Sequence, residues 1–171
     1  MSEDSASKTA LRIAQGSPPE RIAFWIAVSG GAGLSPLWPG TVGSALGVGL
    51  AACLVPAGQI AASVVLALVF VLGVWSSSVI ESESGKDDPQ FVVIDETFGA
   101  AATLVLLPVD PVWWIAGFLF FRIFDVLKPW PANLVHRRMR GGLAIMLDDA
   151  IAVAYAVALL LSAAALFGFV T

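Results

Sequence analysis

Two pairs of neighbouring carboxylates stand at the edges of apolar runs in this sequence. Asp148 and Asp149 precede a long apolar run, and Asp95 and Glu96 follow a short one. A carboxylate beside an apolar segment is costly unless something compensates its charge. Hard oxygen ligands are those that Mg²⁺ takes, so the pairs indicate a cation site. For Asp95 and Glu96 the alternative is a favourable interaction with the dipole of the following helix.

A second group of ionisable residues lies in the segment FFRIFDVLKPWP. If this segment is helical, Arg122, Asp125 and Lys128 follow one another at a spacing of three and share one face. A row of structural salt bridges is one interpretation. Two bases and an acid at the end of an apolar helix also suit a phosphate held next to a metal ion.

The segment LSPLWPGTVGS offers a further phosphate site. Pro39-Gly40 predicts a turn, and the hydroxyls of Thr41 and Ser44 follow it at the expected start of a helix. The free N–H groups and the positive end of a helix dipole suit a phosphate. The alternative is that Thr41 only caps the helix.

The composition favours a membrane protein. Hydrophobic residues make up 58% of the 171 residues, the mean hydropathy is +0.87 and charged residues make up 13%, against about 25% in a typical soluble protein. An unusually apolar soluble helical domain is the alternative. The sequence has no basic face interleaved with aromatics, so we expect no nucleic-acid partner.

Four apolar stretches predict an all-α, multihelical membrane-associated bundle. They cover residues 42–55, 60–80, 97–121 and 150–170. Pro108, Asp110 and Pro111 interrupt the third, which predicts two short helices folded back as a re-entrant hairpin. The polar segments 35–44, 81–96 and 122–149 then meet on one face. The basic residues of the third polar segment, with Lys8, Arg12 and Arg21, place that face in the cytoplasm.

The domain organisation expected from this pattern is simple. Residues 1–20 are polar and predict a disordered cytosolic tail, and residues 21–171 form a single helical domain. Gly141-Gly142 suggests a flexible approach to the last apolar stretch. The sequence does not predict an oligomeric state.

The motifs SPLWPGTVGS, DDPQFVVIDETFG, FRIFDVLKPWP and GGLAIMLDDA appear in the order and spacing of phosphatidylglycerophosphatase A. The chain resembles that family from about Ile22 to Val170. One departure is Ala144, where the family tends to have glycine. The resemblance implies an Mg²⁺-dependent lipid phosphatase of the bacterial inner membrane. Such an enzyme hydrolyses phosphatidylglycerophosphate to phosphatidylglycerol and phosphate, and the anionic phospholipid and the bilayer are then its partners.

Carried onto this chain, the motifs imply a complete candidate site. The expected catalytic residues are acidic: Asp95, Glu96, Asp125, Asp148 and Asp149. The expected metal site uses the same five carboxylates with Asp88 in support. The expected phosphate-binding residues are Gly40, Thr41, Ser44, Arg122 and Lys128. A small membrane transporter or channel and a non-catalytic membrane subunit are the rival interpretations.

Overall fold

The computed structural model describes residues 3–167, and their regular elements are all helical, as the sequence predicts. In chain order these elements are α1 (Glu3–Ala14), α2 (Pro18–Ala27), η1 (Ser29–Leu34), α3 (Pro39–Leu54), η2 (Val55–Ala57), α4 (Gln59–Ser84), α5 (Ile94–Val105), α6 (Pro111–Leu127), α7 (Ala132–Arg138) and α8 (Gly142–Phe167).

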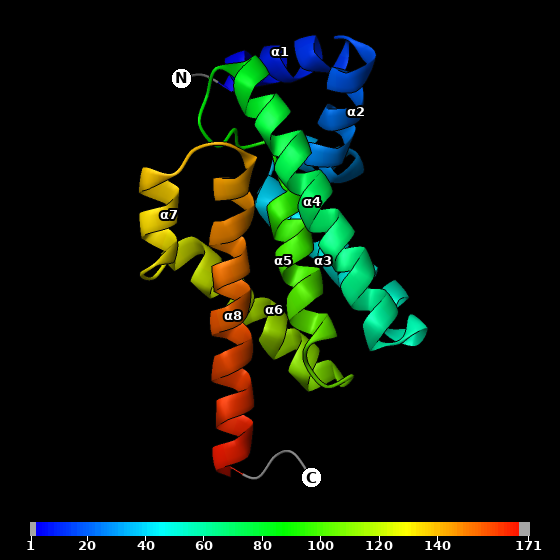
Figure 1. Cartoon of the computed structure of the whole chain (residues 1–171), viewed down its shortest axis with the longest axis vertical. Coiled ribbons are helices and arrows are strands. Elements are labelled where there is room, and N and C mark those ends of the chain that lie inside the picture. The colour runs from blue at the N-terminus through cyan, green and yellow to red at the C-terminus, as the bar shows by residue number, and fades with distance from the viewer. Residues whose placement is uncertain (1–2, 168–171) are drawn as a thin grey trace.

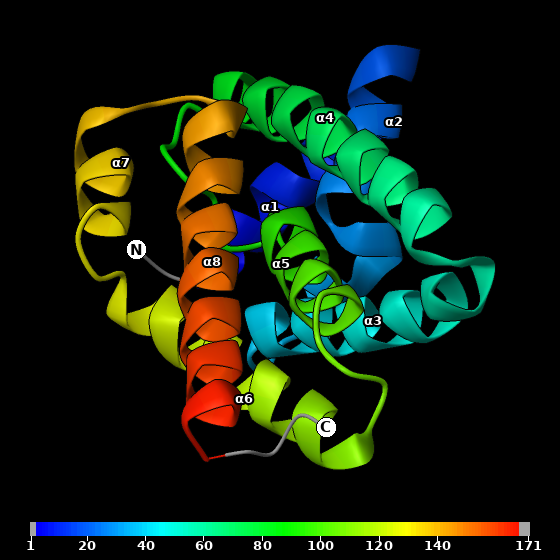
Figure 2. The ribbon, with the colours of Figure 1, turned by 60° about the horizontal axis from the view of Figure 1, so that its bottom comes forward.

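Helix α5 is the centre of the bundle. It packs against α3, α4, α6 and α8, which surround it in Figures 1 and 2. Ala100, Ala101 and Leu104 are completely buried, because α5 is covered on nearly every side. The hydroxyl of Thr97 donates to the carbonyl oxygen of Gly43 at 3.0 Å and so joins α5 to α3. The most enclosed helix therefore carries Asp95 and Glu96 in its first turn.

Three helical segments are long and apolar enough to cross a membrane: Pro39–Ala57, Gln59–Ser84 and Gly142–Leu166. Their outward faces are apolar, as the exposed Val64, Leu68 and Val71 of α4 illustrate. A contiguous apolar surface of this kind is unfavourable in water and favourable against lipid. The protein is therefore membrane-associated. The last residues of the expected stretch 150–170 lie outside the described residues.

The break expected near Pro108 and Pro111 is present. Helices α5 and α6 contact each other as two short helices, of 12 and 17 residues, joined by a turn. Asp110 caps α6, because its Oδ1 accepts from the N–H of Val112 at 2.8 Å. Neither helix reaches the roughly 20 residues that a span requires. A re-entrant position of this turn in the bilayer stays a prediction.

The expected disordered tail is instead largely helical. Residues of α1 and α2 occupy most of the segment 1–20, and Ala10 and Ile13 are buried. A guanidinium N–H of Arg12 donates to the carbonyl oxygen of Glu83, at the end of α4. The prediction of disorder rested on polarity and missed the apolar positions 10 and 13, which lie on one helical face.

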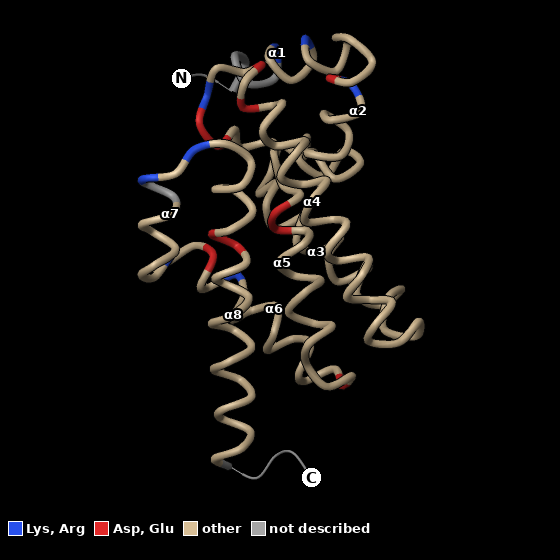
Figure 3. Tube along the Cα trace, in the orientation of Figure 1, with Lys and Arg blue, Asp and Glu red and all other residues tan. Residues whose placement is uncertain are grey.

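Charged residues are distributed unevenly along the molecule. Figure 3 shows most of them at the end that carries α1 and the connection between α7 and α8, with a separate acidic group deeper between α5, α6 and α8. The distal halves of α4 and α8 show neither acids nor bases. This asymmetry gives the bundle one polar end and one apolar body.

Candidate active site

Five acidic residues from three helices converge beneath the polar end. Asp95 and Glu96 lie in the first turn of α5, Asp125 lies near the end of α6, and Asp148 and Asp149 lie in the second turn of α8. All except Glu96 are buried, and the side chain of Glu96 is 18% exposed. Carboxylate oxygens of Asp95, Asp148 and Asp149 lie within 4.8 Å of one another.

The arrangement of these oxygens fits a divalent cation. Oδ1 of Asp95, Oε2 of Glu96 and Oδ2 of Asp149 are buried and accept no hydrogen bond. Buried anions of this kind are costly unless a cation compensates them. Oxygen ligands of one Mg²⁺ lie about 3 to 4 Å apart, close to the separation seen here. Asp95, Asp148 and Asp149, with Glu96, therefore form a suitable donor set for Mg²⁺.

Two bases border the acidic group. The guanidinium of Arg122 contacts the carboxylate of Asp125 and lies 4.0 Å from that of Glu96. The ammonium of Lys128 contacts Asp148. Lys128 ends α6 with a left-handed backbone, at φ 41°, a conformation that costs about 1 kcal/mol or more in a non-glycine residue. This left-handed residue turns the chain at the end of α6, and the side chain of Lys128 contacts Asp148 of α8.

The pKa values of Asp95 and Glu96 follow from their burial and from the neighbouring charges. Burial, and then the neighbouring Glu96 carboxylate, raise the pKa of Asp95 well above its usual range. Burial raises the pKa of Glu96 to about 8, and Asp149 and Asp125 add to the shift against the opposing effect of Arg122. Without a cation, the site therefore retains protons that a metal ion would displace.

For Lys128, in contrast to Asp95 and Glu96, neighbouring charges together affect the pKa more than burial does. Burial lowers the pKa of its ammonium, but the contact with Asp148 and the nearby carboxylates of Asp149 and Asp88 outweigh burial and hold that pKa above its usual value. Lys128 is therefore a permanent positive charge at the site. A fixed cation beside the carboxylates suits an anionic substrate.

The start of α3 lies against the same site. A Cβ atom on Gly40 would lie 2.2 Å from Oε1 of Glu96 and 3.4 Å from Nη2 of Arg122, so a larger residue here would displace the Glu96 carboxylate. Thr41 is exposed in the first turn of α3. Ser44 is completely buried, and its hydroxyl donates to the carbonyl oxygen of Gly40 at 2.9 Å. Phosphate binding by the three residues stays a prediction.

Asp88 occupies the rim rather than the buried group. It is exposed, has a left-handed backbone at φ 48°, and lies close enough to raise the pKa of Asp95. A direct contact between Asp88 and the metal stays a prediction.

The connection into α8 contains a contact that the sequence did not indicate. The hydroxyl of Ser78 on α4 accepts a hydrogen bond from the N–H of Gly142 at 2.9 Å. A Cβ atom on Gly142 would lie 2.0 Å from the carbonyl oxygen of Val74. The interpretation of Gly141-Gly142 as a flexible approach is therefore wrong for Gly142, which lets α8 pack tightly on α4. No local signal identifies Ser78, because its partner lies 64 positions away.

The length of α8 beyond Asp149 is consistent with a site at the boundary between the hydrocarbon core and the lipid headgroups. The segment of α8 that follows the two aspartates, from Ala150 to Phe167, is about 27 Å long at 1.5 Å per residue. That length is close to the roughly 30 Å of a hydrocarbon core. If α8 spans the bilayer, Asp148 and Asp149 lie where the hydrocarbon ends and the headgroups begin.

The protein belongs to the class of helical membrane-associated bundles, and its buried acidic group with two adjoining bases suits a cation and an anionic group. Within that class, the chain belongs to the phosphatidylglycerophosphatase A family, whose sequence profile matches residues 25–164. The protein is accordingly an enzyme, a phosphatase.

Curated relatives agree with this assignment. The chain is 37% identical over 128 residues to phosphatidylglycerophosphatase A of Escherichia coli (strain K12), covering 74% of each chain. It is 34% identical over 134 residues to phosphatidylglycerophosphatase A of Haemophilus influenzae, covering 77% of this chain and 82% of the relative. A Bacteroides thetaiotaomicron protein, provisionally named a phosphatidylinositol-3-phosphatase, is 32% identical over 145 residues, covering 80% and 90%. No solved structure matches the chain.

Proposed function

We propose that this protein is an Mg²⁺-dependent phosphatase that hydrolyses phosphatidylglycerophosphate to phosphatidylglycerol and phosphate. The observation that carries the metal requirement is the group of buried oxygens from Asp95, Asp148 and Asp149 within 4.8 Å. The relatives named phosphatidylglycerophosphatase A support the substrate. The apolar body supports a substrate whose acyl chains stay in the bilayer during the reaction.

The positions of the protein's own residues support the following roles. Asp95, Asp148 and Asp149 would hold the cation, with Glu96 and Asp125 completing the site and Asp88 supporting it from the rim. When bound, Mg²⁺ supplies Lewis-acid activation of the phosphate and of water.

The bases and the start of α3 act on the phosphate itself. Arg122 and Lys128 neutralise the charge on its oxygens, which is a large part of catalysis in phosphoryl transfer. Gly40 lets the first turn of α3 approach Arg122 and Glu96 closely. The positive end of this helix, with the exposed hydroxyl of Thr41 and with Ser44 behind it, provides a further stabilising field for an anion.

The proposed location is the bacterial inner membrane, with the site facing the cytoplasm. Figure 3 shows several bases at the polar end, and the elements there carry Arg12 (α1), Arg21 (α2), Arg138 (α7) and Arg140 (the connection into α8). Basic residues flanking membrane spans favour the cytoplasmic side. The proposed pathway is phosphatidylglycerol synthesis, which the relatives named phosphatidylglycerophosphatase A support.

The direct test measures phosphate release from phosphatidylglycerophosphate in mixed micelles with Mg²⁺ and with EDTA. We expect release with Mg²⁺ and none with EDTA. A parallel assay with phosphatidylinositol 3-phosphate tests the activity that the Bacteroides relative's name suggests, and we expect slower release there. If Mg²⁺ does not promote phosphate release from phosphatidylglycerophosphate, the proposal is wrong.

A further inference from the structure

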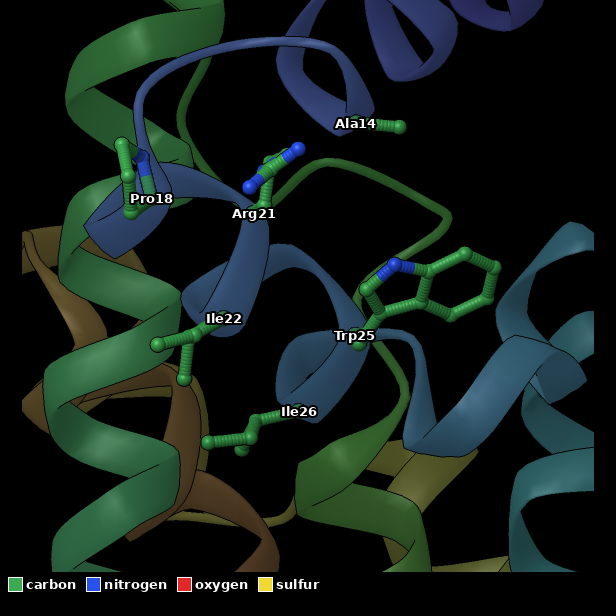
Figure 4. Close-up of a pocket in the computed structure, with 6 residues that line it drawn as sticks. All are labelled: Ala14, Pro18, Arg21, Ile22, Trp25 and Ile26. Carbon is green, nitrogen blue, oxygen red and sulfur yellow. The ribbon is translucent and has the colours of Figure 1, made fainter.

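An open groove lies beside the first two helices, away from the acidic group. Its volume is about 560 Å³, and its lining residues are Ala14, Pro18, Arg21, Ile22, Trp25 and Ile26. Five of these residues come from α2, and Ala14 comes from the end of α1, as Figure 4 shows. Arg21 is the charged residue among them.

This groove is largely outside the region shared with the family. The family match begins at residue 25, so four of the six lining residues precede it. The groove is therefore a feature of this chain's N-terminal segment, and the shared catalytic region does not account for it.

The helices that form the groove are held firmly in place. Ile13 of α1 and Phe24 of α2 are each 1% exposed and belong to one apolar cluster. The carboxylate of Glu20 accepts from the N–H of Ser17 at 3.1 Å, which fixes the start of α2. Glu20 is thereby engaged in the capping box, and Arg21 lies next to the apolar wall.

The chemistry of the groove suits an amphiphilic anion. Ile22 and Trp25 remain 57% and 51% exposed, which is unfavourable for a surface that meets only water. Tryptophan favours the level of the lipid headgroups, where its ring meets both apolar and polar groups. A guanidinium binds phosphate through paired N–H groups. An acyl chain with a phosphate at one end satisfies both requirements.

The position of the groove indicates that the surrounding bilayer supplies this amphiphilic anion. Helix α2 packs directly on α4, one of the candidate spans. The groove therefore lies at the polar end of the bundle beside a lipid-facing helix (Figure 1). The geometry points to an anionic phospholipid of the surrounding bilayer as its occupant, with the phosphate on Arg21 and the upper acyl chain against Ile22, Trp25 and Ile26.

Tryptophan quenching by brominated lipids tests this inference without relying on catalysis. The protein is placed in nanodiscs of phosphatidylcholine containing a minor fraction of phosphatidylglycerol. In one sample the phosphatidylglycerol carries dibrominated acyl chains, and in the other the phosphatidylcholine does. The signal of Trp25 is the difference between the native protein and Trp25→Phe, with Trp25→Tyr as a second variant should the first unfold. We expect phosphatidylglycerol to quench Trp25 with about a fivefold preference, the value of one basic residue near an anionic lipid.

Three variants distinguish specific binding of an anionic lipid in the groove from general contact with the membrane. Arg21→Gln should abolish the preference, and Arg21→Lys should retain part of it. Arg138→Gln is the matched control, because Arg138 is also exposed near the polar end but does not line the groove, and it should retain the full preference. Equal quenching by both lipids overturns the inference. So does quenching by neither lipid, which would indicate that a second copy of the chain covers the groove.

Discussion

At the scale of single residues, Asp149 is among the most enclosed members of the acidic group, at 1% exposure. We expect Asp149→Asn to lower Mg²⁺-dependent phosphate release by at least about 100-fold, since even supporting residues of metal sites cost 10-fold to 100-fold. Because the amide is nearly the same size as the carboxylate, the melting temperature should change little. Phosphate release in mixed micelles and a thermal melt check the two halves of this prediction.

The matched control is another acid near the polar end. Asp87 is paired with Arg140 at 3.6 Å on the exposed surface, and such pairs contribute little. Asp87→Asn should retain activity. Full activity of Asp149→Asn would remove that residue from the site.

The raised pKa of Glu96 predicts how stability depends on pH. Its carboxyl titrates near 8 in the folded protein, against 4.5 as its ordinary value. The folded protein then binds more protons than the unfolded chain between these values, so the stability of the metal-free protein falls as pH rises through this window. Asp95 shifts in the same direction.

Melting temperatures of the EDTA-treated protein in detergent, at about pH 6 and about pH 9, measure this effect. We expect the lower melting temperature at the higher pH. Added Mg²⁺ should remove most of the difference, because it binds the deprotonated carboxylates. Stability that increases across this pH range without metal would contradict the shifts.

At the scale of helices, the contact between α4 and α8 positions two of the aspartates. Gly142→Ala places a methyl group 2.0 Å from the carbonyl oxygen of Val74, so α8 must shift. We expect a loss of about 1–3 kcal/mol, as for other overpacked sites, together with reduced activity. Denaturation in detergent and the phosphate assay measure both effects.

Gly49→Ala is the control for this substitution. Gly49 lies inside α3 with no atom within 4 Å of an added Cβ. Alanine there should stabilise the protein by about 0.5–1 kcal/mol and preserve activity. If Gly142→Ala behaved in the same way, α8 would not depend on this close approach.

The sequence indicated the acidic residues better than it indicated the contact between α4 and α8 that positions two of them. Asp95 and Asp149 stood out because a charge beside an apolar stretch needs compensation, and Asp125 stood out by its spacing from two bases. The structure brings the three aspartates together. Ser78 and Gly142 gave no comparable signal, since their meeting depends on how two distant helices cross. The helix at residues 3–14 was missed because its apolar positions are few among polar neighbours.

At the scale of the whole molecule, the topology is open to a direct test. Cys53 is the only cysteine, so Cys53→Ser gives a background for single-cysteine labelling. We expect Glu83→Cys and Arg138→Cys to react from the same, cytoplasmic side with a membrane-impermeant reagent. Labelling from opposite sides would contradict the re-entrant hairpin of α5 and α6. Asp110→Cys should remain unreactive from both sides if the turn stays within the bilayer.

The two aspartates of α8 have a consequence for how the enzyme is made. They are the last site residues to be synthesised, and they join carboxylates carried by α5 and α6. Until α8 is inserted, the growing chain lacks two of the three oxygens grouped for a cation. We therefore expect a truncated chain that lacks α8 to be inactive, and insertion of α8 to complete the proposed metal site.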